Sequence, residues 1–232
     1  MKKIIFLVLL LTQFSFVLAS EEIHLEKAPI DLSDQSSLQK GARTFINYCL
    51  NCHSAKYMRY NKLLDIGLSK KDIKANLLFT GNEIGDLMEI SMPVKESKQW
   101  FGATPPDLSV VARSRGSNWV YSYMKAFYRD SSREIGWNNV VYVNSSMPHI
   151  LWELQGEQEL DKDTGKLNII KPGKLNQKEY DAVITDLTNF ITYMSEPGQL
   201  KRKKIGLYVV GFLLLLLVLT IKLKKEFWKD IK

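Results

Sequence analysis

Cysteine is scarce in this chain of 232 residues, which contains only Cys49 and Cys52. Two cysteines so close together leave no disulfide framework to assign, and a zinc site built on cysteines would lack ligands because zinc needs four. The chain also lacks a P-loop, the dinucleotide-binding pattern G-x-G-x-x-G and the nucleophile motif G-x-S-x-G. The sequence therefore indicates no catalytic acid, base or nucleophile, and we expect no enzyme activity from the chain by itself.

Basic charge is also scarce in the middle of the chain, although the formal net charge is +7. The excess of lysine and arginine comes from Lys2 and Lys3 and from residues 201–232, and the residues between these ends are slightly acidic. Nucleic-acid binding requires basic charge clustered on the folded domain. We therefore expect no nucleic-acid partner.

The two cysteines belong to the motif Cys49-Leu50-Asn51-Cys52-His53, a C-x-x-C-H sequence typical of covalent c-type haem attachment. Each thiol can bond to one vinyl group of the same porphyrin, and the adjacent histidine then becomes the proximal iron ligand. The alternative is a dithiol/disulfide pair, which would need a βαβ context, whereas the residues before Cys49 have helical periodicity. The motif predicts one covalently attached haem c with His53 bound to the iron.

Long apolar runs occur only at the two ends of the chain. Residues 1–19 contain two lysines, an uncharged stretch and a small-residue cleavage pattern, the layout of a secretory signal peptide, with an uncleaved anchor as the alternative. Haem c is attached after export, so the signal peptide and the C-x-x-C-H motif support each other. Residues 20–200 are then a periplasmic haem domain.

Residues 201–232 are expected to form a membrane anchor with a short cytoplasmic tail. A basic run at 201–204 precedes an uncharged stretch at 205–221, which would extend about 26 Å as a helix, enough for one short span. Basic residues lie on both sides of this span, so the positive-inside rule does not orient it. The orientation follows instead from the signal peptide.

Helical periodicity dominates the soluble part, where we expect a mainly α fold with one small hairpin. A first helix, capped by Ser36 or Ser37, runs to Cys49, and a last helix begins at Asn176, where Glu179 completes a capping box. We expect these two helices to pack across each other. Between them the patterns indicate a surface turn at 54–64, a helix start near Asp107, a helix from Val120 to about Tyr128, an extended segment at 137–144 and a hairpin within 152–170.

Residues 102–109 contain paired prolines that fix an extended approach to the following helix. The carbonyl of Pro105 or Pro106 can accept the ring N–H of His53, the usual outer partner of a metal-ligating histidine; the alternative is a plain helix start. Arg113 and Arg115 follow, and the arginine fork suits haem propionates. Their alternative role is that of solvated charges at a helix end.

The iron needs a sixth ligand, and methionine is the usual partner of histidine in electron-transfer cytochromes. Met58 lies too close to His53 to reach the opposite face, while Met124 and Met194 fall on apolar helix faces and are interpreted as core. Met147 and Met92 remain, and each precedes a proline. Spacing and the small residues before it favour Met147. Ligation by His149 is a further alternative, and His24 in the N-terminal arm is not expected to be a ligand.

The order of these motifs resembles the cytochrome c1 family, the haem-bearing subunit of ubiquinol–cytochrome c oxidoreductase (the bc1 complex), in a bacterial form. The motifs that carry the resemblance are the attachment site through Ser54, residues 102–109 with Arg113 and Arg115, the loop at Met147, and Glu196-Pro197 followed by Lys201-Arg202 and the span. Two segments depart from the family pattern, residues 55–101 and the run at 143–146, which replaces a glycine- and proline-rich loop.

The resemblance implies a class I cytochrome c-like haem domain in which His53 and Met147 are the axial ligands, Pro106 lines the haem pocket and Arg115 meets a propionate. It also implies a redox subunit beside cytochrome b and a Rieske iron-sulfur protein in the bacterial inner membrane. One electron would pass from the Rieske protein through the haem to a soluble or membrane-bound cytochrome c. The alternatives are a membrane-anchored monohaem cytochrome feeding a terminal oxidase or reductase, and a tethered, haem-free thiol oxidoreductase.

Overall fold

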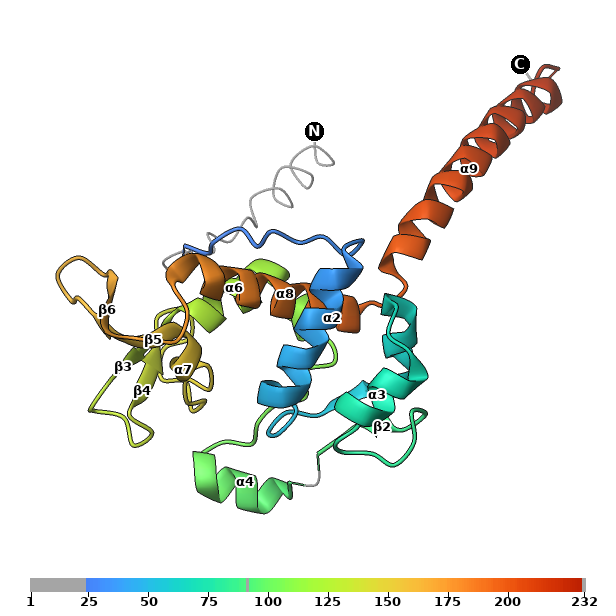
Figure 1. The fold of residues 1–232 in the computed structure, drawn as a ribbon. Coiled ribbons are helices and arrows are strands. Elements are labelled where there is room, and N and C mark those ends of the chain that lie inside the picture. Colours follow the sequence, from blue (N-terminus) through green and yellow to red (C-terminus); the bar gives the residue numbers. More distant parts are fainter. Residues whose placement is uncertain (1–23, 91, 231–232) are drawn as a thin grey trace.

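The computed structural model describes residues 24–90 and 92–230. The described chain is mainly helical, with short two-stranded sheets at the edges of a helical core and one long helix leaving it (Figure 1). This confirms the expected mainly α architecture. The predicted signal peptide, residues 1–19, lies outside the described residues.

Helix α2 (Gln35–Thr44) leads the chain towards the two cysteines and continues as one π-helical turn, η1 (Phe45–Cys49). The predicted apolar face is confirmed, since Leu38, Ala42, Phe45, Ile46 and Cys49 are all buried. The predicted cap is wrong: Asp34 is the N-cap, and its Oδ1 accepts the N–H of Ser37 at 3.0 Å. A carboxylate at this position also interacts favourably with the positive end of the helix dipole.

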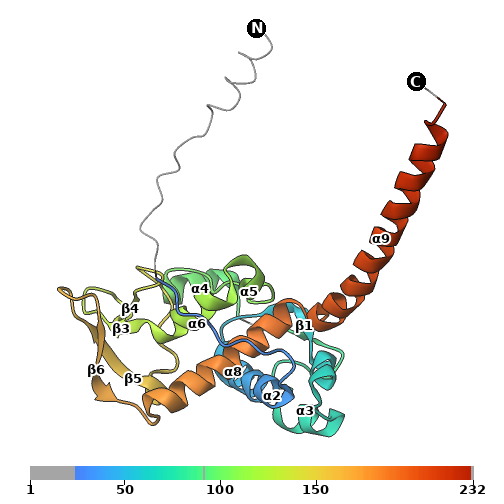
Figure 2. The same cartoon turned by 90° about the horizontal axis from the view of Figure 1, so that it is seen from above.

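Helix α8 (Gln177–Ser195) begins with the predicted capping box, in which Asn176 and Glu179 each accept a backbone N–H of the other. It crosses α2, as predicted, and the two helices form the centre of the core (Figures 1 and 2). They touch at Gly41: a Cβ added there would lie 2.0 Å from the backbone oxygen of Asp186. The absence of a side chain at Gly41 therefore sets how closely the helices approach.

The remaining helices are short and surround this pair. They are the 3₁₀-helix η2 (Tyr60–Ile66) and the α-helices α3 (Lys70–Asn76), α4 (Val94–Phe101), α5 (Val111–Ser114), α6 (Ser117–Lys125) and α7 (Trp152–Gln155). Helix α5 begins four residues after the predicted start at Asp107, and α6 ends at Lys125 rather than near Tyr128, because Phe127 belongs to a strand.

The strands of the described residues pair in three antiparallel couples: β1 (Ala55–Arg59) with β2 (Leu87–Met88), β3 (Phe127–Arg129) with β4 (Trp137–Asn139), and β5 (Gly156–Leu160) with β6 (Leu167–Pro172). The β5–β6 pair is the predicted hairpin. The expected extended segment at 137–144 shortens to β4. The predicted surface turn at 54–64 is wrong, because this segment forms β1, which pairs with β2, and the start of η2, and its Met58 and Tyr60 are buried.

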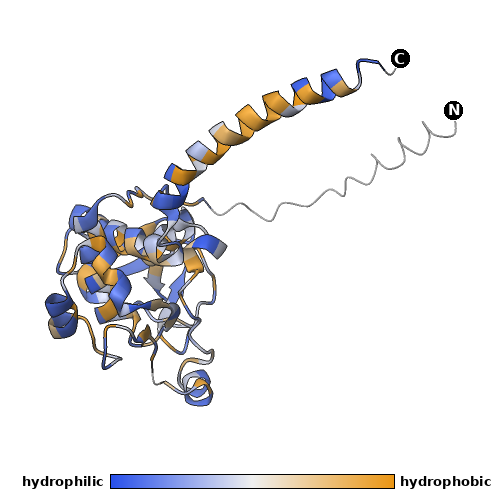
Figure 3. Cartoon of the chain, turned by 90° about the vertical axis from the view of Figure 1, so that its right-hand side faces the viewer, coloured by the Kyte–Doolittle hydropathy of each residue, from blue (hydrophilic) through white to orange (hydrophobic). Residues whose placement is uncertain are grey.

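Helix α9 (Gln199–Phe227) extends away from the globular part and has no buried residue (Figures 1 and 2). Figure 3 shows a continuous hydrophobic stretch along it, between hydrophilic ends. Among the described residues it is the one helix long and apolar enough to cross a membrane. Because apolar side chains exposed on every face are stable in lipid but not in water, α9 is a membrane anchor, as the sequence predicts.

Candidate haem attachment site

The haem attachment motif occupies the tight turn that ends the first helix. The N–H groups of Cys52 and His53 both point back to the carbonyl of Cys49, at 3.1 and 2.9 Å. The same turn therefore holds both cysteines and the histidine. Cys49 and His53 are buried and Cys52 is half-buried, so this group of side chains lies at the boundary between the core and the surface, where a large planar cofactor can be anchored at one edge.

The His53 ring is fixed by a single hydrogen bond. Its Nδ1 lies 2.7 Å from the carbonyl oxygen of Pro106, and because a carbonyl only accepts, Nδ1 must carry the proton. Burial is the main cause that lowers the pKa of His53, so the ring is neutral and Nε2 keeps its lone pair. No hydrogen bond from the described residues reaches Nε2. These residues fit a c-type haem: the free nitrogen is the one that binds iron.

Three hydrogen bonds donated by backbone N–H groups clamp the chain after His53 to the proline loop. The N–H of Leu108 donates to the carbonyl of Ser54 at 2.9 Å, the N–H of Lys56 to Asp107 Oδ2 at 2.9 Å, and the N–H of Tyr57 to Ser109 Oγ at 3.0 Å. From the sequence, Asp107 is expected only near a helix start, and Ser109 has no predicted role. The signal was available in part, because an aspartate before a helix start is typical of an Asx turn; Asp107 makes one with the N–H of Ser109.

We expect Asp107→Ala to loosen this clamp and with it the carbonyl of Pro106. The variant loses the acceptors for the backbone N–H groups of Lys56 and Ser109, which should lower the free energy of unfolding by about 1–2 kcal/mol. It should also broaden the reduction curve of the haem, because the Pro106 carbonyl is held less firmly. Urea unfolding and a redox titration of the haem-loaded protein would measure both. Asp107→Asn keeps one acceptor oxygen and should lie between wild type and alanine; if both variants match wild type, the clamp does not position Pro106.

The loop that carries Met147 is held in place by hydrogen bonds from buried polar side chains. Ser145 Oγ accepts the N–H of Met147 at 3.2 Å and lies 2.7 Å from the hydroxyl of Tyr123. Asn144 has a φ of 62°, in the left-handed region that asparagine tolerates better than most residues. Asn144 therefore provides a left-handed turn at a position where glycine is the usual residue. Met147 itself is half-buried and packs against the core; its role as the sixth ligand stays a prediction.

The other candidates for the sixth ligand lie in different surroundings. Met92 is half-buried in the segment between β2 and α4, and His24 is exposed. His149 is buried, stacked on Phe127 with ring centroids 4.9 Å apart and edge-on to Trp137 at 5.2 Å. This packing favours a core role for His149. Met58, Met124 and Met194 are also buried, as the core interpretation of the latter two requires.

Arg115 ends α5 and lies against two aromatic rings. Its guanidinium carbon is 5.3 Å from the centroid of Trp119 and 5.8 Å from that of Tyr142, and such stacking restricts where the guanidinium can point. Trp119 also stacks on Tyr123, which supports the Met147 loop. Arg115 and this loop are therefore linked through shared rings. Both Arg115 and Arg113 are exposed, and contact of Arg115 with a propionate stays a prediction.

The burial of the two cysteines also bears on the alternative that the chain is a thiol oxidoreductase. A reactive dithiol needs a lowered thiol pKa, because the thiolate is the nucleophile. Burial, reinforced by Cys52, instead raises the pKa of Cys49 to about 12, and burial also raises that of Cys52. The two thiols therefore lack the lowered pKa of a reactive dithiol, which disfavours this alternative.

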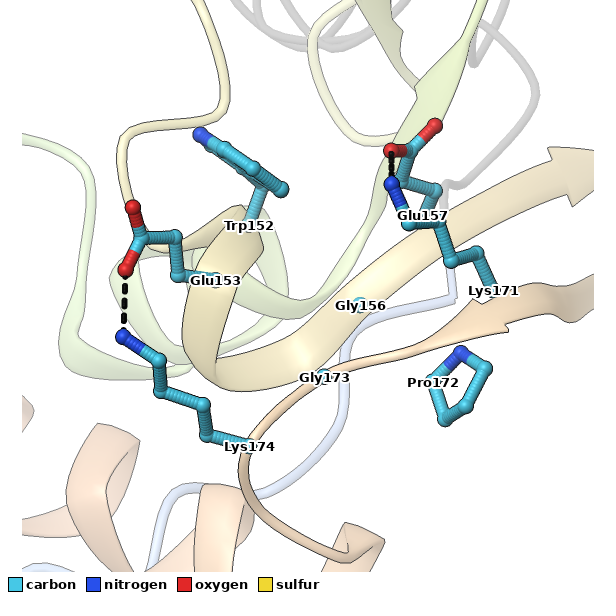
Figure 4. Close-up of a pocket in the computed structure, with 8 residues that line it drawn as sticks. All are labelled: Trp152, Glu153, Gly156, Glu157, Lys171, Pro172, Gly173 and Lys174. Atoms are coloured by element: carbon cyan, nitrogen blue, oxygen red, sulfur yellow. Dashed lines mark hydrogen bonds and ion pairs between the residues drawn. The ribbon is translucent and has the colours of Figure 1, made fainter.

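A separate surface groove of about 430 Å³ lies between α7 and the β5–β6 hairpin. Figure 4 shows that its walls carry two ion pairs, Glu153 with Lys174 and Glu157 with Lys171. Hydrogen bonds from Arg129 and Lys171 lower the pKa of Glu157 to about 2. No residue predicted to bind haem lines this groove, so it is distinct from the attachment site.

The lowered pKa of Glu157 predicts a pH-dependent contribution to stability. The folded-state value lies below the ordinary 4.5, so the stabilisation is present above pH 4.5 and is lost as the pH falls towards 2. Glu157→Gln should therefore lower the urea midpoint at pH 7 more than at pH 3. Glu159→Gln is the control, since Glu159 is on the same strand without an ion pair among the described residues. Equal effects at both pH values would contradict the assignment.

Comparison with known proteins finds one family model and several relatives that match most or all of the chain. The model of the Cytochrome C1 family matches residues 25–231. A protein from Nitrosomonas europaea named ammonia monooxygenase gamma subunit is 48% identical over 231 residues, covering 100% of this chain and 99% of the relative. Cytochrome c1 from Allochromatium vinosum is 44% identical over 243 residues, covering both chains completely, and that from Rhodospirillum rubrum is 27% identical, covering 86% of this chain and 83% of the relative.

Proposed function

We propose that this chain, which belongs to the cytochrome c1 family, is the electron-transfer subunit of a membrane-bound quinol–cytochrome c reductase. The observation that carries the proposal is the attachment turn itself, where the His53 ring is neutral, buried and oriented by the Pro106 carbonyl with Nε2 free. Together with Cys49 and Cys52 this is a complete proximal half of a c-type haem site. The chain carries one covalently attached haem c.

Each site residue has a defined task in this proposal. Cys49 and Cys52 fix the porphyrin to the end of the first helix, and His53 supplies the proximal nitrogen. Met147 supplies the second axial ligand, and Arg115 neutralises a propionate. Bound haem c provides a one-electron couple whose potential the axial ligands and the surrounding shell adjust. The residues of this chain bind and orient the cofactor and exclude water from it, and none acts as an acid or base.

The electron donor and acceptor follow from the family. The chain receives one electron from the Rieske iron-sulfur protein, works beside cytochrome b, and passes the electron to a soluble or membrane-bound cytochrome c. Reductase activity belongs to the assembled complex. The helix α9 holds the chain in the membrane, and the signal peptide predicted at residues 1–19 supports a haem domain on the periplasmic side of a bacterial inner membrane. A monohaem cytochrome feeding a terminal oxidase or reductase is the alternative.

The name of the Nitrosomonas relative refers to a monooxygenase, which must bind and activate O₂. Electron transfer through a haem with two protein ligands leaves no open position for O₂. Carbon monoxide distinguishes the two cases, because it binds reduced haem only where an axial position is open. We expect the visible spectrum of the reduced protein to be unchanged by carbon monoxide; a shifted Soret band would favour an oxygen-binding role.

The test of the proposed function combines a spectrum with isolation of the complex. Expressed in a strain able to mature haem c, the protein should show a c-type α band and should co-purify with cytochrome b and a Rieske protein. Membranes should then reduce cytochrome c with quinol, and His53→Ala should abolish this activity. A c-type band without these two partners would favour the terminal-oxidase alternative, and no haem band at all would overturn the cytochrome assignment.

A further inference from the structure

A groove runs along one face of α9, where this helix leaves the globular part. Its lining residues are Gly198, Lys201, Arg202, Ile205, Gly206 and Val209. Their spacing of three and four residues places them on a single helix face. Near the globular part the groove is lined by the aliphatic stems of Lys201 and Arg202, whose charged groups lie at its mouth, and inside the apolar stretch it is lined by Ile205, Gly206 and Val209. A charged end followed by an apolar channel matches the shape and polarity of a phospholipid.

The depth of these residues also matches a lipid. Lys201 precedes Ile205, the first residue of the apolar stretch, by four residues, which is about 6 Å along a helix. The polar layer on each side of a bilayer is roughly 5–7 Å thick. Lys201 therefore lies at the level of lipid phosphates, and the stretch from Ile205 to Val209 lies at the level of the acyl chains in the same leaflet.

The charge at the mouth of the groove is positive and only partly neutralised. Arg202 pairs with Glu196 at the end of α8, with Nη2 donating to Oε2 at 3.1 Å. Because the Glu196 side chain is only 17% exposed, this pair fixes the groove against the globular part. Lys201 has no acidic partner among the described residues, and the guanidinium of Arg202 retains N–H groups beyond those used by Glu196. An anionic phosphodiester would satisfy both.

The middle of the groove is open because position 206 is glycine. No atom of the described chain lies within 4 Å of the place where a Cβ at Gly206 would be. Ile205 and Val209 flank this gap on the same face. An acyl chain can therefore lie directly against the helix backbone, where it gains dispersion contacts that a side chain would otherwise block.

We propose that this groove binds one anionic phospholipid of the leaflet on the haem-domain side, with the phosphate at Lys201 and Arg202 and one acyl chain along Ile205, Gly206 and Val209. The Glu196–Arg202 ion pair holds the start of α9 against the globular part, and the bound lipid holds the next turns of α9 in the membrane. Together they restrain the angle between α9 and the globular part. The proposal depends on α9 crossing a membrane and not on haem ligation. It can therefore fail while the electron-transfer function stands.

The test uses the full-length, haem-loaded chain in phosphatidylcholine nanodiscs with a trace of photoactivatable phosphatidylglycerol or, separately, photoactivatable phosphatidylcholine. Mass spectrometry locates the labelled residues. We expect the anionic probe to label 205–209 several-fold more than the zwitterionic probe. Lys201→Gln should lower the anionic labelling about fivefold, the worth of one basic residue near an anionic surface. Gly206→Leu should block it by filling the gap.

Two matched variants lie on the opposite side of the helix. Lys203→Gln removes the same charge two residues away, and Gly211→Leu adds the same side chain at another open position; both should label like wild type. Equal labelling by the two probes, or equal losses in Lys201→Gln and Lys203→Gln, would overturn the proposal. A third outcome concerns the intact complex. If the groove is unlabelled there and Gly206→Leu releases cytochrome b, a protein helix occupies the groove, and the lipid proposal is wrong. The haem spectrum confirms that each variant is folded.

Discussion

Replacing Met147 by leucine is expected to lower the haem reduction potential by hundreds of millivolts. Axial ligands can change haem reduction potentials over a range of roughly 0.8 V. Leucine fills nearly the same volume, so the loop should keep its packing at a cost below about 1.5 kcal/mol, but it offers no sulfur to the iron. A thioether ligand raises the potential by favouring ferrous iron. The reduced protein should keep its c-type α band, and the oxidised protein should lose the methionine-to-iron charge-transfer band at the red edge of the visible spectrum.

The matched control for this experiment is Met92→Leu, which removes the other methionine that precedes a proline. It should leave the potential and the charge-transfer band unchanged. If Met147→Leu is silent and Met92→Leu lowers the potential, the segment between β2 and α4 carries the ligand instead. If both are silent, His149 is the residue to replace next, although its position between Phe127 and Trp137 makes it a core side chain.

The features that the sequence predicted correctly are those encoded by nearby residues. The haem motif lies within five consecutive positions, the capping box joins Asn176 to Glu179, and the apolar face of the first helix repeats with helical spacing. The anchor was equally clear, because an uncharged run of that length has few other uses. The sequence allows the carbonyl of either Pro105 or Pro106 as the partner of His53, and the structure selects Pro106.

The features that were missed depend on residues distant in the chain. The segment at 54–64 has charged and aromatic residues typical of a surface, but Ala55 pairs with Met88 in a sheet, and Met58 and Leu63 are buried. The carboxylate of Asp107 holds a backbone N–H that is 51 residues away. No local periodicity encodes such contacts. Asn144 illustrates a third case, since its left-handed backbone replaces an expected glycine and only the structure reveals the turn.

Gly41→Ala is expected to be among the most destabilising single substitutions in the soluble part. In an isolated helix, alanine would be favoured over glycine by about 1 kcal/mol. Here the added Cβ would lie 2.0 Å from the backbone oxygen of Asp186 and 2.7 Å from the Cβ of Phe190. These contacts involve α8 itself and cannot be relieved by a side-chain rotation, so the crossing of α2 and α8 must widen. We expect a net loss of about 2–3 kcal/mol, measured by urea unfolding of the haem-loaded protein.

The comparison that isolates this packing effect is Gly85→Ala. Gly85 lies in a loop, its added Cβ would meet no atom within 4 Å, and its φ is not in the left-handed region, so alanine there should be neutral or slightly stabilising. Because α2 continues through η1 to Cys49, a wider crossing also shifts the attachment turn relative to the Pro106 carbonyl. Gly41→Ala should therefore lower the yield of haem-loaded protein as well as its stability. Wild-type stability in Gly41→Ala would mean that the two helices cross with more space than the structure gives them.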